Sequence, residues 1–251
     1  MAAAGWNGGV THMKTEAHDT EFSKCRRGNE NGMLITAAAL ALAASGAVHD
    51  GECGDAIRPL PKPVHGAMSV EEAIAGRRSV RSFSPQPLSD SAIGALLFAA
   101  QGITDAVTGF RAAPSAGATY PLEIYLLTQL GVEHYLPRQH ALERVHAGDV
   151  RPRLARACLG QEFIAQSPAI IVMTAVHERT RRRYGERALR YVAMEAGHAA
   201  QNIHLQAVAL GLGSVPIGAF DDGAVERIIG CGRGEQALYV IAVGRPLQTI
   251  R

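Results

Sequence analysis

The sequence predicts a domain of the α+β class that is organised around one long helix. Residues 190–213 carry apolar side chains at alternating steps of three and four, which is the spacing of one face of an α-helix. Two short apolar runs rich in β-branched residues, at residues 122–128 and 169–175, are typical of buried strands. Helices and strands follow one another irregularly, without the strand–helix–strand alternation of a doubly wound parallel sheet. These three observations favour α+β over α/β.

Residues 1–66 differ in composition from the rest of the chain and are expected to form a leader and a linker. The apolar run at residues 33–44 follows Arg26 and Arg27 and precedes small residues, which is the layout of an export signal. The arginine pair suits twin-arginine export to the periplasm, and the run is too short to span a bilayer, so no stable membrane insertion is expected. A leader with one amphiphilic helix on a cytoplasmic protein is the alternative, and both interpretations stay open.

The folded domain is expected at residues 67–251, after a stiff linker that contains Pro59, Pro61 and Pro63. With 251 residues, of which 47% are hydrophobic and 19% charged, the chain can bury one sizeable core. Its formal charge of +2 gives no field that would indicate a nucleic-acid partner. The cysteines form no CxxC pair and three histidines, expected in loops or at the surface, lack metal-like spacing, so no metal is predicted. These residues are Cys25, Cys53, Cys158, Cys231, His134, His140 and His146.

Capping residues mark the starts of three shorter helices. Ser69 and Glu72 form a capping box, so a helix begins there and runs toward an arginine-rich segment. A second helix begins near Ser89 and ends at Gly102, and Asp221 can cap a third. A further helix is expected near residues 150–159, and strands or extended segments at residues 132–137, 214–220 and 237–243.

The long helix carries a second stripe, which consists of small residues and is broken only by His204. A flank without large side chains lets another backbone approach closely, so we expect this helix to be buried by neighbouring elements or by a second subunit. A polar strip occupies another face, and each of its residues taken singly is more typical of a hydrogen-bonded core position than of a functional site. The small residues are Ala193, Gly197, Ala200, Ala207 and Gly211, and the polar residues are Glu195, His198, Asn202 and Gln206.

An arginine-rich segment, Arg77, Arg78, Ser79 and Arg81, is the first candidate binding site. If the chain is extended after the first helix, Arg77, Ser79 and Arg81 project to one side. They then offer two guanidinium groups and a hydroxyl to one anion, for which a phosphate is the obvious choice. The alternative is that these arginines complement the dipole at the end of the helix and face water.

Two loops of small residues are candidates for contact with a flat ligand. Small side chains let such a ligand lie against the backbone, where N–H groups can meet ring heteroatoms. A glycine pattern at residues 230–234 precedes a strand instead of following one, so it is not a dinucleotide-binding fingerprint. The candidate loop residues are Pro114, Ser115, Ala116 and Gly117 in the first loop, and Pro216, Ile217 and Gly218 in the second.

Five segments, taken in order, resemble the nitroreductase superfamily and within it the SagB-type dehydrogenases. They are RRSVRSF from Arg77, AQGIT from Ala100, PSAGATYPLE from Pro114, EAGHAAQN from Glu195 and PIGAFDD from Pro216. The resemblance extends over residues 68–248, and several motifs in order are far more specific than any one of them.

This resemblance implies a nitroreductase-like α/β/α sandwich, with a mixed, largely antiparallel sheet around a long central helix. It also implies a homodimer formed through that helix, with one FMN per active site at the subunit interface. By position, residues 77–81 match the family's segment for the FMN phosphate and ribityl chain. Residues 114–117 match the loop that lies on the flavin ring from the other subunit, and residues 216–218 match the loop near its reactive edge. Arg245, after the last strand, would add a phosphate contact.

The implied activity is that of an FMN-dependent oxidoreductase. Hydride would pass through flavin N5 between an electron donor, for which NADH and NADPH are candidates, and a small organic or peptide-derived substrate. In azoline-oxidising SagB-type members a Lys-Tyr pair occupies the positions of Arg183 and Tyr184. Arginine stays protonated, so Tyr184 is left as the candidate catalytic residue, as a proton donor. The alternatives are an azoline oxidase of a peptide-modification pathway and a flavin-binding protein without turnover.

Overall fold

The computed structural model describes residues 57–64 and 66–247. The export signal expected around residues 33–44 lies outside this range and stays a prediction. Within the described residues, no helix combines the length and the apolar character that a bilayer crossing requires.

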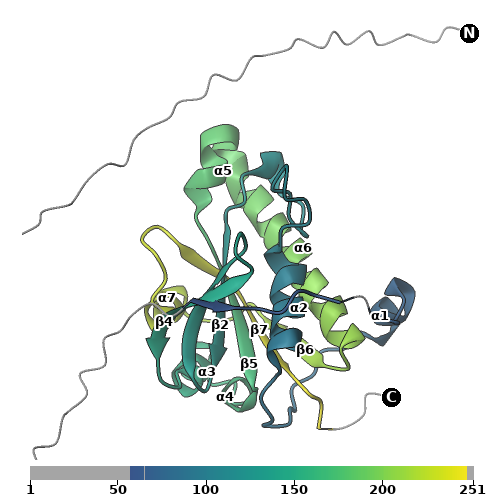
Figure 1. Ribbon diagram of the computed structural model, residues 1–251. Helices are drawn as coiled ribbons and strands as arrows, with labels where there is room; N and C mark the ends of the chain where they lie inside the picture. Colours follow the sequence, from purple (N-terminus) through teal and green to yellow (C-terminus); the bar gives the residue numbers. More distant parts are fainter. Residues whose placement is uncertain (1–56, 65, 248–251) are drawn as a thin grey trace, which may run out of the picture. The chain divides into compact units, whose positions relative to one another are not determined.

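Seven strands of the described chain form one sheet, with the order β1-β4-β3-β2-β5-β7-β6 (Figure 1). Neighbouring strands are antiparallel throughout this order, and the parallel contact is an isolated bridge between Ser79 and Ser214. The predicted α+β class with a largely antiparallel sheet is therefore confirmed. The strands are β1 (Ile57–Pro59), β2 (Leu122–Thr128), β3 (Gly131–Leu136), β4 (Ala141–Ala147), β5 (Ala169–Ala175), β6 (Gly213–Ile217) and β7 (Gln236–Gly244).

Helices cover both faces of the sheet. Side chains of the central strand β5 alternate between the two faces, as the two-residue period of a strand requires: Ile171 packs with α2 and α6, and Ile170 with α3, α4 and α7. This arrangement confirms the predicted α/β/α sandwich, and α1 and α5 lie near opposite ends of α6 (Figure 1). The helices are α1 (Val70–Gly76), α2 (Asp90–Gln101), α3 (Arg151–Ala157), α4 (Phe163–Gln166), α5 (His177–Tyr184), α6 (Ala188–Ala209) and α7 (Asp222–Ile229).

The central helix α6 ends earlier than the apolar spacing predicts. It stops at Ala209, and Gly211 adopts a φ of 69°, a left-handed conformation that glycine accepts without strain. Gly213, which the prediction placed at the end of the helix, begins β6 instead. Val192, Ala196, Ala199 and Ile203 are buried as expected, whereas Leu210 is exposed.

The segment expected as a proline linker contributes to the sheet. Ile57–Pro59 pairs with β4, the Leu60 amide donates to the carbonyl oxygen of His140 at 2.9 Å, and the Leu60 side chain is buried. Residues 57–60, which the sequence assigned to the linker, therefore pack with the described sheet. Gly94 permits the segment after β1 to cross over α2, because a Cβ at Gly94 would lie 2.8 Å from the carbonyl oxygen of Pro61.

The predicted capping box at the start of α1 is present. The Glu72 amide donates to Ser69 Oγ at 3.1 Å, and the Ser69 amide donates to Glu72 Oε2 at 2.8 Å. We expect Ser69→Ala to lower the free energy of unfolding by about 1 kcal/mol, measured by urea denaturation. Ser82→Ala is the control, because no described group bonds its hydroxyl. Equal effects of the two substitutions would show that the cap contributes nothing.

Candidate functional site

The arginine-rich segment leaves α1 and runs beside the edge strand β6. Arg77 is the C-cap residue of α1 with extended backbone angles, Ser79 bridges to Ser214, and the Val80 amide donates to the Ser214 carbonyl at 3.1 Å. Gly213 allows this approach, because a Cβ there would lie 2.6 Å from a Val80 methyl carbon. The segment is therefore extended after the first helix, as the phosphate hypothesis requires.

Arg245 reaches the same region from the end of β7. Its carbonyl oxygen accepts from the Ser84 amide at 2.8 Å, and Phe83 pairs with Pro246. Arg77 is half-buried, Arg81 and Arg245 are exposed, and no carboxylate of the described residues lies within 4 Å of any of the three. Unpaired cations on neighbouring backbone segments suit an anionic ligand.

Arg78 differs from its neighbours in the segment. Its guanidinium donates to the carbonyl oxygens of Ala75 and Arg77, at 2.9 and 2.8 Å. It thus satisfies groups at the end of α1, which is the dipole-complementing role considered as the alternative for all the arginines.

His204 on α6 joins this end of the molecule, and sequence reasoning did not assign it to a site. Its Nδ1 lies 2.7 Å from Ser214 Oγ. Burial, with the nearby charge of Arg77, lowers the pKa of His204 to about 4, so the ring is neutral at pH 7. Its buried Nε2 has no hydrogen-bond partner among the described residues. The sequence signal available for this position was that His204 interrupts the stripe of small residues on the long helix.

The second predicted loop continues directly from this region. Pro216 and Ile217 are the last residues of β6, and Gly218 follows them with an exposed backbone. A Cβ at Gly218 would meet no atom within 4 Å, so a flat ligand has room to approach.

The first predicted loop, residues 114–117, continues into strained backbone at Ala118 and Tyr120. Gly117, Ala118 and Tyr120 have φ values of 60°, 54° and 44°, and the last two are unfavourable for residues with a Cβ. The Tyr120 amide donates to Ser115 Oγ at 2.9 Å, and the hydroxyls of Thr119 and Thr180 lie 2.8 Å apart. Such strain persists only where the surroundings enforce it, and it is concentrated at functional sites.

Arg183 and Tyr184 lie directly against this loop. A Cβ on Gly117 would lie 2.7 Å from Tyr184 Oη and 2.8 Å from Arg183 Nη1, and Arg183 donates to the Gly117 carbonyl at 3.3 Å. The Tyr184 ring is fixed edge-on against Tyr191, with ring centroids 5.0 Å apart. The structure thus brings the candidate catalytic residue to the 114–117 loop.

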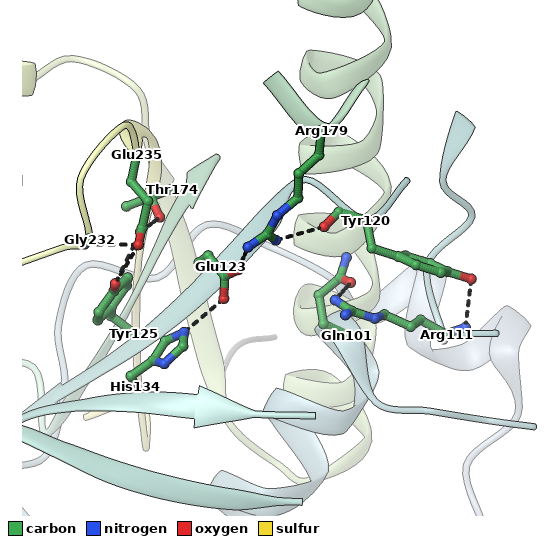
Figure 2. Close-up of polar contacts among 10 residues, drawn as sticks. All are labelled: Gln101, Arg111, Tyr120, Glu123, Tyr125, His134, Thr174, Arg179, Gly232 and Glu235. Atoms are coloured by element: carbon green, nitrogen blue, oxygen red, sulfur yellow. Dashed lines mark hydrogen bonds and ion pairs between the residues drawn. The ribbon is translucent and has the colours of Figure 1, made fainter. Parts of the chain in front are cut away.

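A buried polar cluster beneath the loop includes Gln101, Arg111 and Glu195. Arg111 donates to Gln101 Oε1 at 2.9 Å and lies 4.5 Å above the centre of the Tyr120 ring (Figure 2). Glu195 is 3% exposed, and burial raises its pKa to about 7, partly offset by Ser115, Arg111 and Gln101. Within the described residues, Glu195 Oε1 and Gln101 Nε2 have no hydrogen-bond partner. The sequence placed Glu195 on a polar strip but gave no sign of its burial.

Arg179 on α5 links the loop to the sheet. It lies between Glu123, which it contacts at 2.5 Å, and the Tyr120 carbonyl, to which it donates at 3.0 Å (Figure 2). His134 contacts the same carboxylate at 2.8 Å, and the pKa of Glu123 is lowered by these partners in spite of its burial.

The glycine pattern at residues 230–234 is part of a turn before β7. Glu235 accepts from the Gly232 amide at 2.9 Å, and Tyr125 and Thr174 on neighbouring strands bond the same carboxylate (Figure 2). The Glu235 carboxylate is already occupied by these hydrogen bonds, which indicates a structural role for the turn.

The three histidines expected at the surface or in loops are half-buried and bonded. His134 contacts Glu123, His140 lies 2.8 Å from Tyr135 Oη and 2.9 Å from the Pro61 carbonyl, and His146 lies 2.9 Å from the Ile228 carbonyl. The expectation is confirmed for His140, which lies in the turn between β3 and β4, and it was wrong for His134 and His146, which lie in β3 and β4 themselves. Over the described part of the chain, no group of three metal-ligating side chains occurs.

The two halves of the candidate site lie along α6 but do not meet in one chain. Gly76 approaches Val208 near the end of α6, whereas Ser115 interacts with Glu195 in its first half. Thirteen residues of helix separate Glu195 from Val208, which corresponds to about 20 Å. The structure therefore brings residues 77–81, 214–218 and 245 together, and residues 114–117 with Arg183 and Tyr184 separately.

Comparison with known proteins identifies the family. The family model described as the nitroreductase family matches residues 74–245. A Methanocaldococcus jannaschii protein described as a nitroreductase is 43% identical over 187 residues, covering 72% of this chain and 93% of its own length. The chain belongs to the nitroreductase family, which makes it a nitroreductase-family oxidoreductase.

Solved structures agree with this fold. A structure from Ralstonia eutropha described as a nitroreductase has a TM-score of 0.70 and 28% identity, covering 76% of this chain and 90% of the other. The NADPH:FMN oxidoreductase of Vibrio harveyi, solved with NAD⁺, has a TM-score of 0.54 and 21% identity, covering 71% of this chain and 69% of the other. At that identity the second likeness shows the fold alone.

Proposed function

We propose that the protein is an FMN-dependent oxidoreductase that works as a homodimer. The observation that carries the proposal is that the backbone segment 77–84 runs beside β6 and Arg245, with three arginines, Arg77, Arg81 and Arg245, that make no ion pair to described carboxylates. Three unpaired guanidinium groups near the exposed Gly218 at the end of β6 fit a ligand with a phosphate tail and a flat ring. Membership of the nitroreductase family supports the same cofactor.

Each predicted segment has a defined task in this proposal. Arg77, Ser79, Arg81 and Arg245 bind the phosphate and ribityl chain, and Arg78 supports the segment from α1. Pro216, Ile217 and Gly218 lie at the edge of the ring, to which the exposed Gly218 presents its backbone N–H group. FMN, when bound, supplies hydride transfer at N5. His204, neutral at pH 7, is available to bond uncharged polar groups near Arg77.

The homodimer follows from the separation of the two halves. Pro114, Ser115, Ala116 and Gly117 lie about 20 Å along α6 from the phosphate region of their own chain, so a second chain would bring its copy of this loop to the ring. A strip of α6 is exposed and carries apolar or small residues, as a helix that packs on its own copy requires. The strip comprises Leu189, Ala193, Met194 and Gly197.

Tyr184 is proposed as the proton donor to the reduced substrate. Its hydroxyl lies at Gly117 and Arg183 donates beside it, so the pair can deliver a proton and orient an electronegative group. Arg183 cannot act as a base, because a guanidinium stays protonated. We therefore propose a general reductase or dehydrogenase of the SagB-type group, with a small organic or peptide-derived substrate, instead of an azoline oxidase.

The test is spectroscopic. Residues 57–251, purified and loaded with FMN, are expected to be yellow, to have the mass of a dimer by light scattering, and to lose the flavin absorbance anaerobically with NADH or NADPH. Bleaching by dithionite alone would favour a flavin-binding protein without turnover. Failure to bind FMN would reject the proposal, and a monomer that retains FMN tightly would reject its dimeric form.

A further inference from the structure

The loop 110–120 surrounds an open hollow of about 550 Å³. Its lining is mainly apolar and includes Phe110, Ala113, Pro114 and the Tyr120 ring. Arg111 and Ser115 supply polar groups to the same lining. A hollow of this composition suits an apolar or aromatic molecule that carries one polar end.

Three guanidinium groups contact the loop or belong to it. Arg179 is neutralised by Glu123 at 2.5 Å. Arg111 and Arg183 have no described carboxylate within 4 Å, and their contacts are neutral: Gln101 and the Tyr120 ring for Arg111, and the Gly117 carbonyl for Arg183. Arg111, which lines the hollow, and Arg183, which contacts the lining residue Gly117, are thus left without a described counter-charge.

The environment of Arg111 makes this lack of a partner costly. Its guanidinium is half-buried, and desolvation lowers the pKa of Arg111 in spite of the more distant Glu123 and Glu195. A partly desolvated cation is stabilised by an anion that enters the same hollow. Arg183 is also exposed, but it differs from Arg182 in its partner: Arg182 contacts the carboxylate of Glu178, whereas Arg183 donates to the Gly117 carbonyl of the loop.

We propose that the hollow is an anion subsite, and that the substrate of the flavin site is an apolar or aromatic molecule with a carboxylate or phosphate group. Arg183 and Arg111 hold the anionic group, and the apolar lining holds the remainder. The assignment of the anion as a substrate rests on the proposed function. The subsite itself is formed only by residues of this chain.

The binding test needs no turnover. Calorimetric titration of the FMN-loaded protein with benzoate, phenyl phosphate and benzyl alcohol compares two anions with a neutral molecule of similar size. We expect one or both anions to bind at least 10-fold more tightly than the alcohol, with an affinity that falls as salt rises. The tighter of the two identifies the anionic group. Equal binding of all three, or an affinity that salt does not change, would overturn the proposal.

Matched variants locate the subsite. Arg183→Gln is expected to remove most of the preference for the anion, Arg183→Lys to retain part of it, and Arg182→Gln to leave it unchanged. Arg111→Gln should also reduce the preference for the anion. If the preference is unchanged in the Arg183→Gln protein, Arg183 is not part of the subsite.

Kinetic measurements distinguish a failure of this inference from a failure of the proposed function. The ratio of kcat/KM for 4-nitrobenzoate over 4-nitrobenzyl alcohol should fall in Arg183→Gln mainly through KM. If the protein reduces both compounds equally, the anion subsite fails and the oxidoreductase stands. If the protein binds no FMN, the proposed function fails, and the titrations on the flavin-free protein still decide the subsite.

Discussion

Replacing Arg77 or Arg81 by alanine is expected to weaken FMN binding by roughly 10- to 150-fold for each substitution. A hydrogen bond between charged groups contributes about 1.5–3 kcal/mol, and each 1.4 kcal/mol changes a dissociation constant tenfold. Arg77 is half-buried beside β6, so its loss should approach the upper end, whereas the exposed Arg81 should approach the lower end. The measurement is a titration of FMN with the flavin-free protein, followed by flavin fluorescence at fixed ionic strength.

A charge-matched control distinguishes a direct contact with FMN from the general electrostatic effect of removing one positive charge. Arg153→Ala removes the same charge from an exposed position on α3, on the face of the sheet opposite α6, and should change the dissociation constant less than twofold. If Arg77→Ala and Arg153→Ala bind FMN equally well, the arginine-rich segment does not bind the phosphate.

The second large effect concerns the stability of the protein and its dependence on pH. The carboxyl of Glu195 has its pKa raised to about 7 by burial, from an ordinary value of 4.5. Between these two values the folded protein holds a proton that the unfolded chain releases, so stability falls as pH rises through this window. The decrease attributable to Glu195 is about 3 kcal/mol, and it is complete above pH 7.

Glu195→Gln is expected to remove this dependence, because the amide resembles the protonated acid. Urea unfolding of the flavin-free protein at pH 5 and pH 8 should show a smaller loss of stability in the variant than in the wild type. Glu186→Gln, at an exposed position just before α6, is the control and should follow the wild type. Parallel behaviour of the wild type and Glu195→Gln would mean that the carboxyl is ionised at both pH values.

The elements with a local chemical signature were predictable from the sequence. Ser69, Ser89 and Asp221 each cap a helix, as their side chains and spacing indicate. The apolar run of β5 is buried on both faces and was recognisable as a strand. Strands β1 and β4 were not expected, because β1 is short and lies at the edge of the sheet, and β4 mixes half-buried charged residues with apolar ones.

The features of the candidate site also divide into those that the sequence predicts and those that it does not. Small-residue loops and clustered arginines are visible in the sequence, because they depend on residue type and spacing alone. The roles of Arg111, Glu195 and His204 depend on burial by segments distant in the chain, and a spacing argument contains no information about burial. The end of α6 also escaped the prediction, since the apolar spacing continues to Leu210 while Gly211 turns the backbone.

The placement of the two half-sites along α6 has a genetic consequence in the proposed dimer. A chain with a damaged phosphate segment and a chain with a damaged 114–117 loop would both be inactive alone. Paired with each other, they would form one site that contains both defects and one site that contains neither. Two defective alleles would therefore complement each other when expressed in the same cell, although neither encodes a working enzyme.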